Sequence, residues 1–263
     1  MKFALIFSLL AGAIFADEPL HLELGKAHRL LGDKVRVRAK PDTQSAVLAE
    51  LAIGTEVNPT AQAVEKHTQD GVEAPWYKVS FSKDGKRSEG YVWGNLIAKG
   101  YTVSKDGLIF LYGVGKGKKE EGGYESFNSQ VRIAKDNKEL ARGVFDEGTG
   151  FATRVNVQLT GGRGFSGVQN ILSVQFQQEF CGGKGNTMYI FWDGSKLSKA
   201  HSTIDGADAP VYAIETLTFP DDNGGKKDEL LLTQETGDHD NPKAKRIQKV
   251  RLRWNGKKFI KAS

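Results

Sequence analysis

The sequence predicts an all-β protein. Throughout the 263-residue chain, short segments carry an apolar residue at every second position, which is typical of strands with one buried face. Gly, Asn and Asp separate these segments, and glycine alone accounts for 31 residues, as many tight turns require. Helical patterns are few and predict a helix at 20–31 and a helical turn near 45–51. Strands joined by short turns favour antiparallel sheets.

The chain begins with a pattern typical of a secretory signal peptide. Lys2 precedes an apolar run over 3–15, and Ala16 ends that run with a small residue. The run is too short to span a bilayer as a helix. We expect cleavage after Ala16, with Ala13 as the alternative site. The protein is therefore predicted to be secreted or periplasmic, with residues 1–16 as the signal peptide and no transmembrane segment.

Charge and cysteine content narrow the partners and the compartment. Without the predicted signal peptide, 36 Lys and Arg residues stand against 32 Asp and Glu residues. This small excess is spread along the chain, so nucleic acid is not an expected partner. The single Cys181 excludes an internal disulfide, and export without disulfides favours a bacterial envelope. We interpret Cys181 as a buried free thiol, because its neighbourhood lacks the base that a nucleophile needs.

Four short clusters between residues 35 and 97 follow the order of a small β-barrel. Pro41 ends the first strand, and Asp84-Gly85 predicts a hairpin between the last two. The order resembles the bacterial Src-homology-3-like domain, although the segment 63–75 is longer and more polar than usual. We place the barrel at 33–100, after a linker at 17–32. The clusters are Val35-Arg36-Val37-Arg38-Ala39-Lys40-Pro41, Gly54-Thr55-Glu56-Val57, Trp76-Tyr77-Lys78-Val79 and Gly90-Tyr91-Val92-Trp93.

This resemblance implies an envelope protein whose barrel binds a peptide or a cell-wall component such as peptidoglycan. Such domains carry no chemistry themselves and often target a neighbouring enzyme to the wall. The aromatic residues that could line the implied recognition groove are Trp76, Tyr77, Tyr91 and Trp93. They alternate along two strands, so only some of them can face a groove while the others fill the core.

Residues 101–263 predict a larger antiparallel β domain, arranged as a partial propeller-like sheet, a sandwich or an irregular barrel. The segments that begin Trp192-Asp193-Gly194 and Trp254-Asn255-Gly256 are similar, and Asp136-Asn137 lies in a weaker third copy. These residues accept positive φ at both central positions of a hairpin, so each copy predicts a tight turn. Repeated β units and a coincidence of common turns are both open as explanations.

The loop from Phe219 to Leu231 resembles the calcium loops of β-propeller repeats. Asp221, Asn223 and Asp228 match those loops in type, and calcium prefers such oxygen ligands. However, the loop is one residue short, a glycine replaces one expected acid, and two lysines oppose a cation. These departures favour a polar turn, so we expect no cofactor.

Two other features of the second domain have ordinary explanations. Residues 162–167 match G-x-G-x-x-G, but a strand and not a helix is expected after them, which favours a flexible loop over a nucleotide site. Residues 241–263 carry nine cations and no acid, whereas 221–240 carry seven acids. These cations form either an outward strand face that pairs within the chain or a surface for an anionic wall polymer or lipid.

We therefore predict an exported, non-enzymatic cell-envelope binding protein. The barrel contacts a peptide or cell-wall ligand, and the second β domain binds an unidentified partner. The alternative is a cell-wall hydrolase with the barrel as its targeting module, which needs paired carboxylates or an activated cysteine. A purely structural or assembly role is the third hypothesis.

Overall fold

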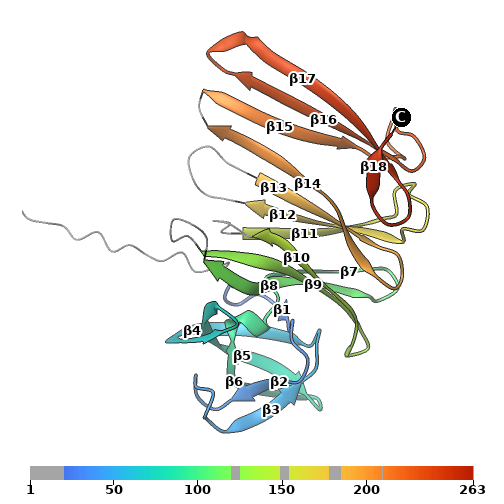
Figure 1. Ribbon diagram of the computed structural model, residues 1–263. Helices are drawn as coiled ribbons and strands as arrows, with labels where there is room; N and C mark the ends of the chain where they lie inside the picture. The colour runs from blue at the N-terminus through green and yellow to red at the C-terminus, as the bar shows by residue number, and fades with distance from the viewer. Residues whose placement is uncertain (1–20, 120–124, 149–153, 178–184, 209, 263) are drawn as a thin grey trace, which may run out of the picture.

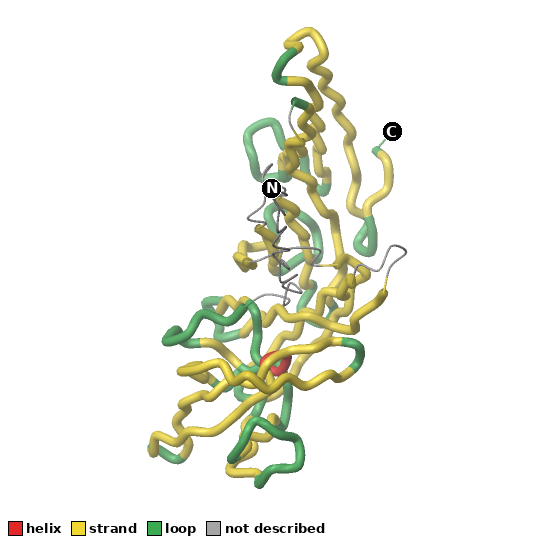
Figure 2. Tube along the Cα trace, turned by 90° about the vertical axis from the view of Figure 1, so that its left-hand side faces the viewer, coloured by secondary structure: helices red, strands yellow, loops and turns green. Residues whose placement is uncertain are grey.

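The computed structural model describes residues 21–119, 125–148, 154–177, 185–208 and 210–262. These residues form eighteen strands in three antiparallel sheets, which confirms the all-β prediction (Figure 1). One short 3-10 helix, η1 (Gly94–Leu96), lies within the barrel (Figure 2). No helix among the described residues is long and apolar enough to span a membrane.

The helical predictions near the N-terminus are wrong. Residues 21–27 are irregular, the next two residues form a strand, and 47–51 form another strand. Leu22 and Leu30 are buried in the barrel core, 5% and 0% exposed. Their burial against other strands decides the local structure, because helix propensity is a weak preference that packing overrides.

The first sheet curls into a half-barrel in the order β1-β4-β5-β6-β2-β3. Its first long alternation behaves as predicted, since Val35 and Val37 are buried while Arg36 is exposed. Asp84 and Gly85 both have positive φ, 52° and 73°, which confirms the predicted hairpin. The strands are β1 (His28–Arg29), β2 (Val35–Arg38), β3 (Val47–Leu51), β4 (Glu56–Gln69), β5 (Val72–Lys83) and β6 (Lys86–Trp93).

The second sheet is a central layer with two buried faces. Leu111 packs with Ile53 of the barrel region, whereas the next residue along the strand, Tyr112, faces the third sheet. The long β4–β5 hairpin, which explains the unusual segment 63–75, also reaches this sheet: the N–H of Gly117 donates to the carbonyl of Asp70 at 3.1 Å. The strands are β7 (Gly100–Val103), β8 (Ile109–Lys119), β9 (Glu125–Lys135) and β10 (Lys138–Gly148).

The third sheet is an eight-stranded meander in chain order. One face of β12 and β13 packs on the second sheet, and the sheet then extends well beyond both lower layers (Figures 1 and 2). Both C-terminal sheets are open, and where they face each other the arrangement is that of a sandwich. The strands are β11 (Arg154–Gly161), β12 (Asn170–Gln177), β13 (Gly185–Trp192), β14 (Leu197–Asp208), β15 (Val211–Thr218), β16 (Glu229–Asp238), β17 (Asn241–Trp254) and β18 (Phe259–Lys261).

A second core forms where the meander divides. Strands β14 and β15 pair only through Asp205–Asp208 and Val211–Ile214 and then separate. Beyond that point, Leu230 and Trp254 pack with Phe191 of β13. The G-x-G-x-x-G loop adds Phe165, 5% exposed, to this core, so the loop is anchored and not free. A strand follows the loop, as predicted, and the helix that a nucleotide site needs is absent there.

The two tryptophan hairpins share one structure, but not the predicted one. The Asp193 Oδ1 atom accepts from the N–H groups of Ser195 and Lys196, at 2.8 and 2.7 Å, and Asn255 makes the same pair of bonds in its own turn. Only the glycine of each turn has positive φ, since the side-chain oxygen closes a longer loop. The predicted turn with two positive φ values occurs at Asp136-Asn137.

Candidate functional site

The four predicted aromatic residues divide between the two faces of the barrel, as their alternation requires. Tyr77 is 1% exposed in the barrel core, and Trp76 pairs with Trp93 on the outer face. Both tryptophans are only 4% exposed, and the Trp93 Nε1–H donates to the carbonyl of Ala74 at 3.0 Å. Of the four, Tyr91 alone is half-buried and not fully buried. These contacts show a packing role, and a binding role for the four residues stays a prediction.

A groove lies on the barrel where β4 and β5 separate. The ladder between them ends at the pair Asn58–Ser80. Beyond it, the start of β4 pairs with β1, while β5 continues along β6 to Lys83. The separation leaves a groove of about 410 Å³, within the usual range for ligand sites. Its lining residues are Thr55, Glu56, Val57, Asn58, Ser80, Phe81, Ser82 and Arg87.

This groove carries both signs of charge and several hydrogen-bonding groups. The Arg87 Nη2 atom lies 3.4 Å from Ser80 Oγ, and Glu56 lies 3.4 Å from Arg29 at the other side. The Asn58 Oδ1 atom is buried and has no hydrogen-bond partner among the described residues. Such an atom gains from a bound water or ligand donor. The groove therefore offers a carboxylate, a guanidinium and the Asn58 amide oxygen to a polar ligand.

Sequence reasoning missed this groove, although part of the signal was present. Alternation through Ser80-Phe81-Ser82 predicts two serines opposite a core phenylalanine, and Phe81 is indeed 5% exposed. The groove itself depends on where the β4–β5 ladder ends. That point is fixed by pairing between distant residues and has no local pattern.

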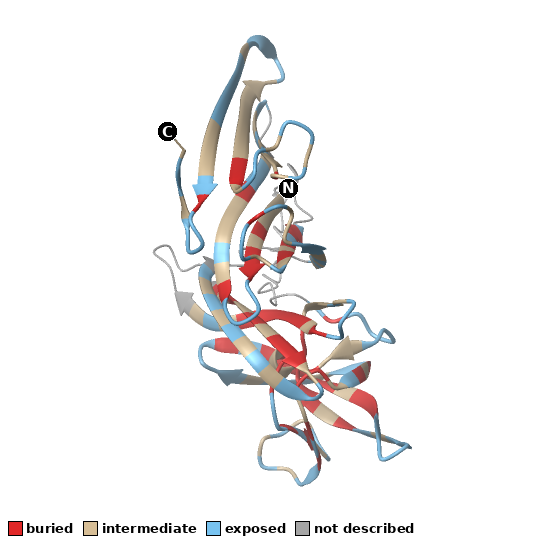
Figure 3. Ribbon diagram, turned by 90° about the vertical axis from the view of Figure 1, so that its right-hand side faces the viewer, coloured by how far each residue is buried: buried red, intermediate tan, exposed pale blue. Residues whose placement is uncertain are grey.

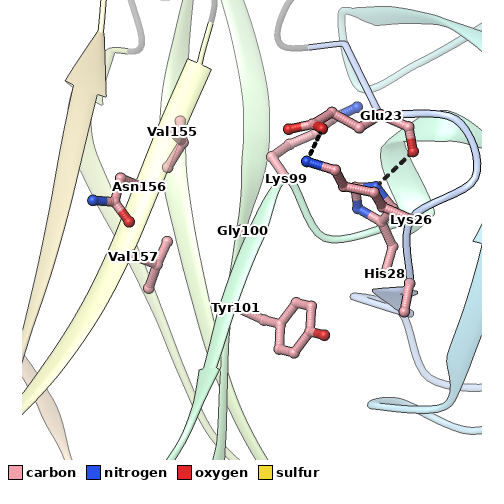
Figure 4. Close-up of a pocket in the computed structure, with 10 residues that line it drawn as sticks. Glu23, Lys26, His28, Lys99, Gly100, Tyr101, Val155, Asn156 and Val157 are labelled. Atoms are coloured by element: carbon pink, nitrogen blue, oxygen red, sulfur yellow. Dashed lines mark hydrogen bonds and ion pairs between the residues drawn. The ribbon is translucent and has the colours of Figure 1, made fainter.

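A smaller cleft of about 200 Å³ lies between the N-terminal segment, β7 and β11 (Figure 4). Glu23 forms an ion pair with Lys26 on one wall, and the Glu23 carbonyl accepts from His28 Nε2 at 3.2 Å. Burial is the main reason why the pKa of His28 lies below its ordinary value. The opposite wall is formed by Val155 and its neighbours on β11. This cleft marks the junction between the barrel and the sheets that follow.

Two of the three predicted calcium residues, Asp221 and Asp228, make protein contacts of their own, and Asn223 lies in the same loop. Arg163 Nε donates to Asp221 at 2.9 Å, its guanidinium also pairs with Asp222, and Asp228 accepts from the Ser166 hydroxyl at 2.9 Å. No group of three His, Cys, Asp or Glu residues suited to a metal occurs in the described part of the chain. We refer to the contacts of Arg163 with Asp221 and Asp222 as the loop latch.

Two predictions concern residues that the structure does not describe. Cys181 and the signal peptide at 1–16 lie outside the described ranges. The thiol and the export signal therefore stay sequence-based predictions.

Comparison with known proteins identifies one part of the chain. Residues 33–98 match the bacterial SH3 domain family. No curated protein matches the chain, and no solved structure matches it. Nothing identifies the residues that follow the barrel, whereas bacterial SH3 domains are cell-wall targeting and binding modules. The four strand clusters and this match agree that residues 33–98 form a bacterial SH3 domain.

Proposed function

We propose that the chain is an exported cell-envelope binding protein whose bacterial SH3 domain holds a wall peptide in the groove between β4 and β5. The observation that carries this proposal is the groove of about 410 Å³, whose lining contains both Glu56 and Arg87. A peptide with a carboxylate and an amino group meets both charges. Guanidinium–carboxylate contacts are strong and directional, so Arg87 is the main anchor.

An open strand edge supports an extended peptide in this groove. Strand β5 continues from Phe81 to Lys83 after its ladder with β4 has ended. Alternate residues of an unpaired edge present N–H and C=O groups that an added strand can use. Ser82, exposed in the same lining, supplies a further hydrogen bond. The peptide backbone thus binds along β5 while its charged groups reach Glu56 and Arg87.

Retention on purified peptidoglycan tests this proposal. We expect Arg87→Ala to weaken retention by about tenfold or more, since it removes a charged hydrogen-bonding partner. Arg36→Ala is the matched control, because Arg36 is exposed on β2 of the same domain and outside the groove. Circular dichroism of both variants checks the fold.

Four results would redirect the proposal. No retention of the parent protein rejects wall binding. Equal weakening by both arginine variants indicates general charge attraction in place of a site. If Tyr91→Ala loses retention while the Arg87 variant keeps it, the ligand binds at the aromatic face and not in the groove. Release of soluble wall fragments would favour the hydrolase alternative.

A further inference from the structure

The outer edge of β17 is open along most of its length. Strand β17 pairs with β16 on one side, but on the other side β18 pairs only with Leu252–Trp254. Among the described residues, Asn241 to Val250 thus form an open edge of the largest sheet (Figure 1). An edge of this kind is a template for pairing with another strand.

The hydrogen bonds at the end of β17 show which backbone groups point outward. The Trp254 N–H donates to the Asp228 carbonyl on the β16 side at 2.7 Å, and the Arg251 carbonyl accepts from Ala262 on the opposite side at 2.9 Å. Because antiparallel ladders alternate, Lys249 and Ile247 also direct their N–H and C=O groups away from β16. The regular ladder ends at the pair Thr236–Arg246, next to Lys245.

Lys245, Ile247 and Lys249 share one side-chain face, since they lie two positions apart. In the ladder, Ile247 lies opposite Glu235 of β16. Lys245 forms an ion pair with Glu235 at 2.7 Å. Lys249 has Thr233 opposite and no carboxylate partner among the described residues. Ile247 is 54% exposed. The edge thus presents a cation, an aliphatic side chain and a second cation in sequence.

This pattern selects against most strands. Lysines on an edge strand hinder its pairing with uncharged strands of other molecules. A second copy of β17 would bring like charges together. An added strand can carry acidic residues opposite Lys245 and Lys249. Their Cβ atoms would lie about 4.5–5.5 Å from the Cβ atoms of the lysines, where opposite charges stabilise the pair. An apolar residue between the acids would cover Ile247.

We infer that the β17 edge binds an extended segment of a partner protein with the pattern acid-x-apolar-x-acid. The inference is independent of the proposed wall-peptide groove, which lies on the SH3 domain. A membrane surface fits the same face less well, since it would also meet the carboxylate of Glu235. A strand paired to the edge alone meets Glu235 only through its ion pair with Lys245.

A binding assay with the full chain tests the inference. The probe is a labelled short peptide, Thr-Glu-Thr-Ile-Thr-Glu-Thr, and the reference is a peptide of the same composition with its two Glu residues adjacent. We expect the alternating peptide to bind about tenfold more tightly, because only this peptide places its two Glu residues four positions apart, as Lys245 and Lys249 are. Lys249→Glu should abolish this preference. Lys257→Glu, in the exposed β17–β18 turn, makes the same charge change away from the ladder and should preserve it.

Backbone pairing is tested at Ile247. Ile247→Pro removes an outward N–H and should weaken binding of the alternating peptide by about tenfold, whereas Ile247→Ala keeps that donor and loses less. Equal binding of both peptides, or of inorganic polyphosphate, would show unspecific anion attraction and overturn the inference. Binding to anionic phospholipid vesicles but to neither peptide would overturn it in favour of a membrane. No binding of any probe would leave the lysines as edge protection alone. Arg87→Ala should bind the peptide normally, which separates this test from that of the wall-peptide groove.

Discussion

The SH3 domain and the second sheet form one region, which we call the lower layers, and β15–β17 form the far end of the third sheet. Both regions are antiparallel ladders, but they differ in whether another layer packs on them. In the lower layers, Leu111 and Tyr112 are adjacent and both 0% exposed, because each face of β8 has a partner. At the far end, Val211 and Ile247 are 53% and 54% exposed. Figure 3 shows that the strands at this end are coloured mostly as intermediate or exposed. Strand pairing alone therefore does not specify burial; the next layer does.

Local contacts take the place of layered burial at the far end. The Tyr212 hydroxyl donates to Glu235 at 3.1 Å, and Lys245 pairs with the same carboxylate. The Tyr212 ring also covers Gly237, where an added Cβ would lie 2.4 Å from the Tyr212 hydroxyl oxygen. Cross-strand pairs of this kind contribute about 0.2–1 kcal/mol each, less than a buried leucine.

The largest expected effect is the difference between two aliphatic truncations. Leu111→Ala removes a fully buried side chain between the SH3 domain and the central sheet, and should lower the free energy of unfolding by about 2–5 kcal/mol. Ile247→Ala acts on an exposed position and should change it by about 0.5 kcal/mol or less. Urea unfolding of both variants measures the two values. Similar losses would mean that the far end is covered in solution.

Breaking the loop latch should have a smaller and more local effect. Arg163→Ala removes the contacts to Asp221 and Asp222 and the stacking of the guanidinium 4.3 Å from the Phe219 ring centroid. The expected loss is about 1–2 kcal/mol, since partly exposed ion pairs and cation–π contacts are each modest.

Hydrogen exchange separates a local effect of the latch from a global one. Amides of β15 and β16 should exchange faster in Arg163→Ala, while those of the SH3 domain keep their protection. The control is Lys66→Ala, which breaks an exposed ion pair with Glu73 on the β4–β5 hairpin. Uniform acceleration across all three sheets would show that the lower layers and the far end unfold as one unit.

The sequence was most informative where structure depends on neighbours along the chain. Alternation through Val35-Arg36-Val37 and the Asp84-Gly85 turn predicted strands and a hairpin that the structure contains. The period of a strand is a local property, and the order of such strands sufficed to identify the SH3 domain. The predicted helix at 20–31 failed because long-range burial of Leu22 and Leu30 decides that segment.

The candidate sites were less predictable because they are made by contacts across the chain. The calcium loop matched in residue types, but Arg163, from another hairpin, neutralises Asp221 and Asp222. The cationic segment at 241–263 was visible as composition. Its division into an open edge and a covered end depends on how far β18 pairs with β17.

The smallest expected effect is a pH dependence of stability that is confined to the SH3 domain and the sheets that pack next to it. Burial lowers the pKa of His28 in the folded state below the value of about 6.5 that the unfolded chain has. As the pH falls below about 6.5, the unfolded chain takes up this proton first, so stability falls with pH through that window. His28→Gln should flatten the decline, measured as the difference from the parent by urea unfolding between neutral and mildly acidic pH. Other titrating groups are common to both proteins and cancel in that difference. Because His28 lies where the barrel meets β7 and β11, amide exchange in β15–β17 should not follow it. A decline that is equally steep in His28→Gln would remove the junction as its source.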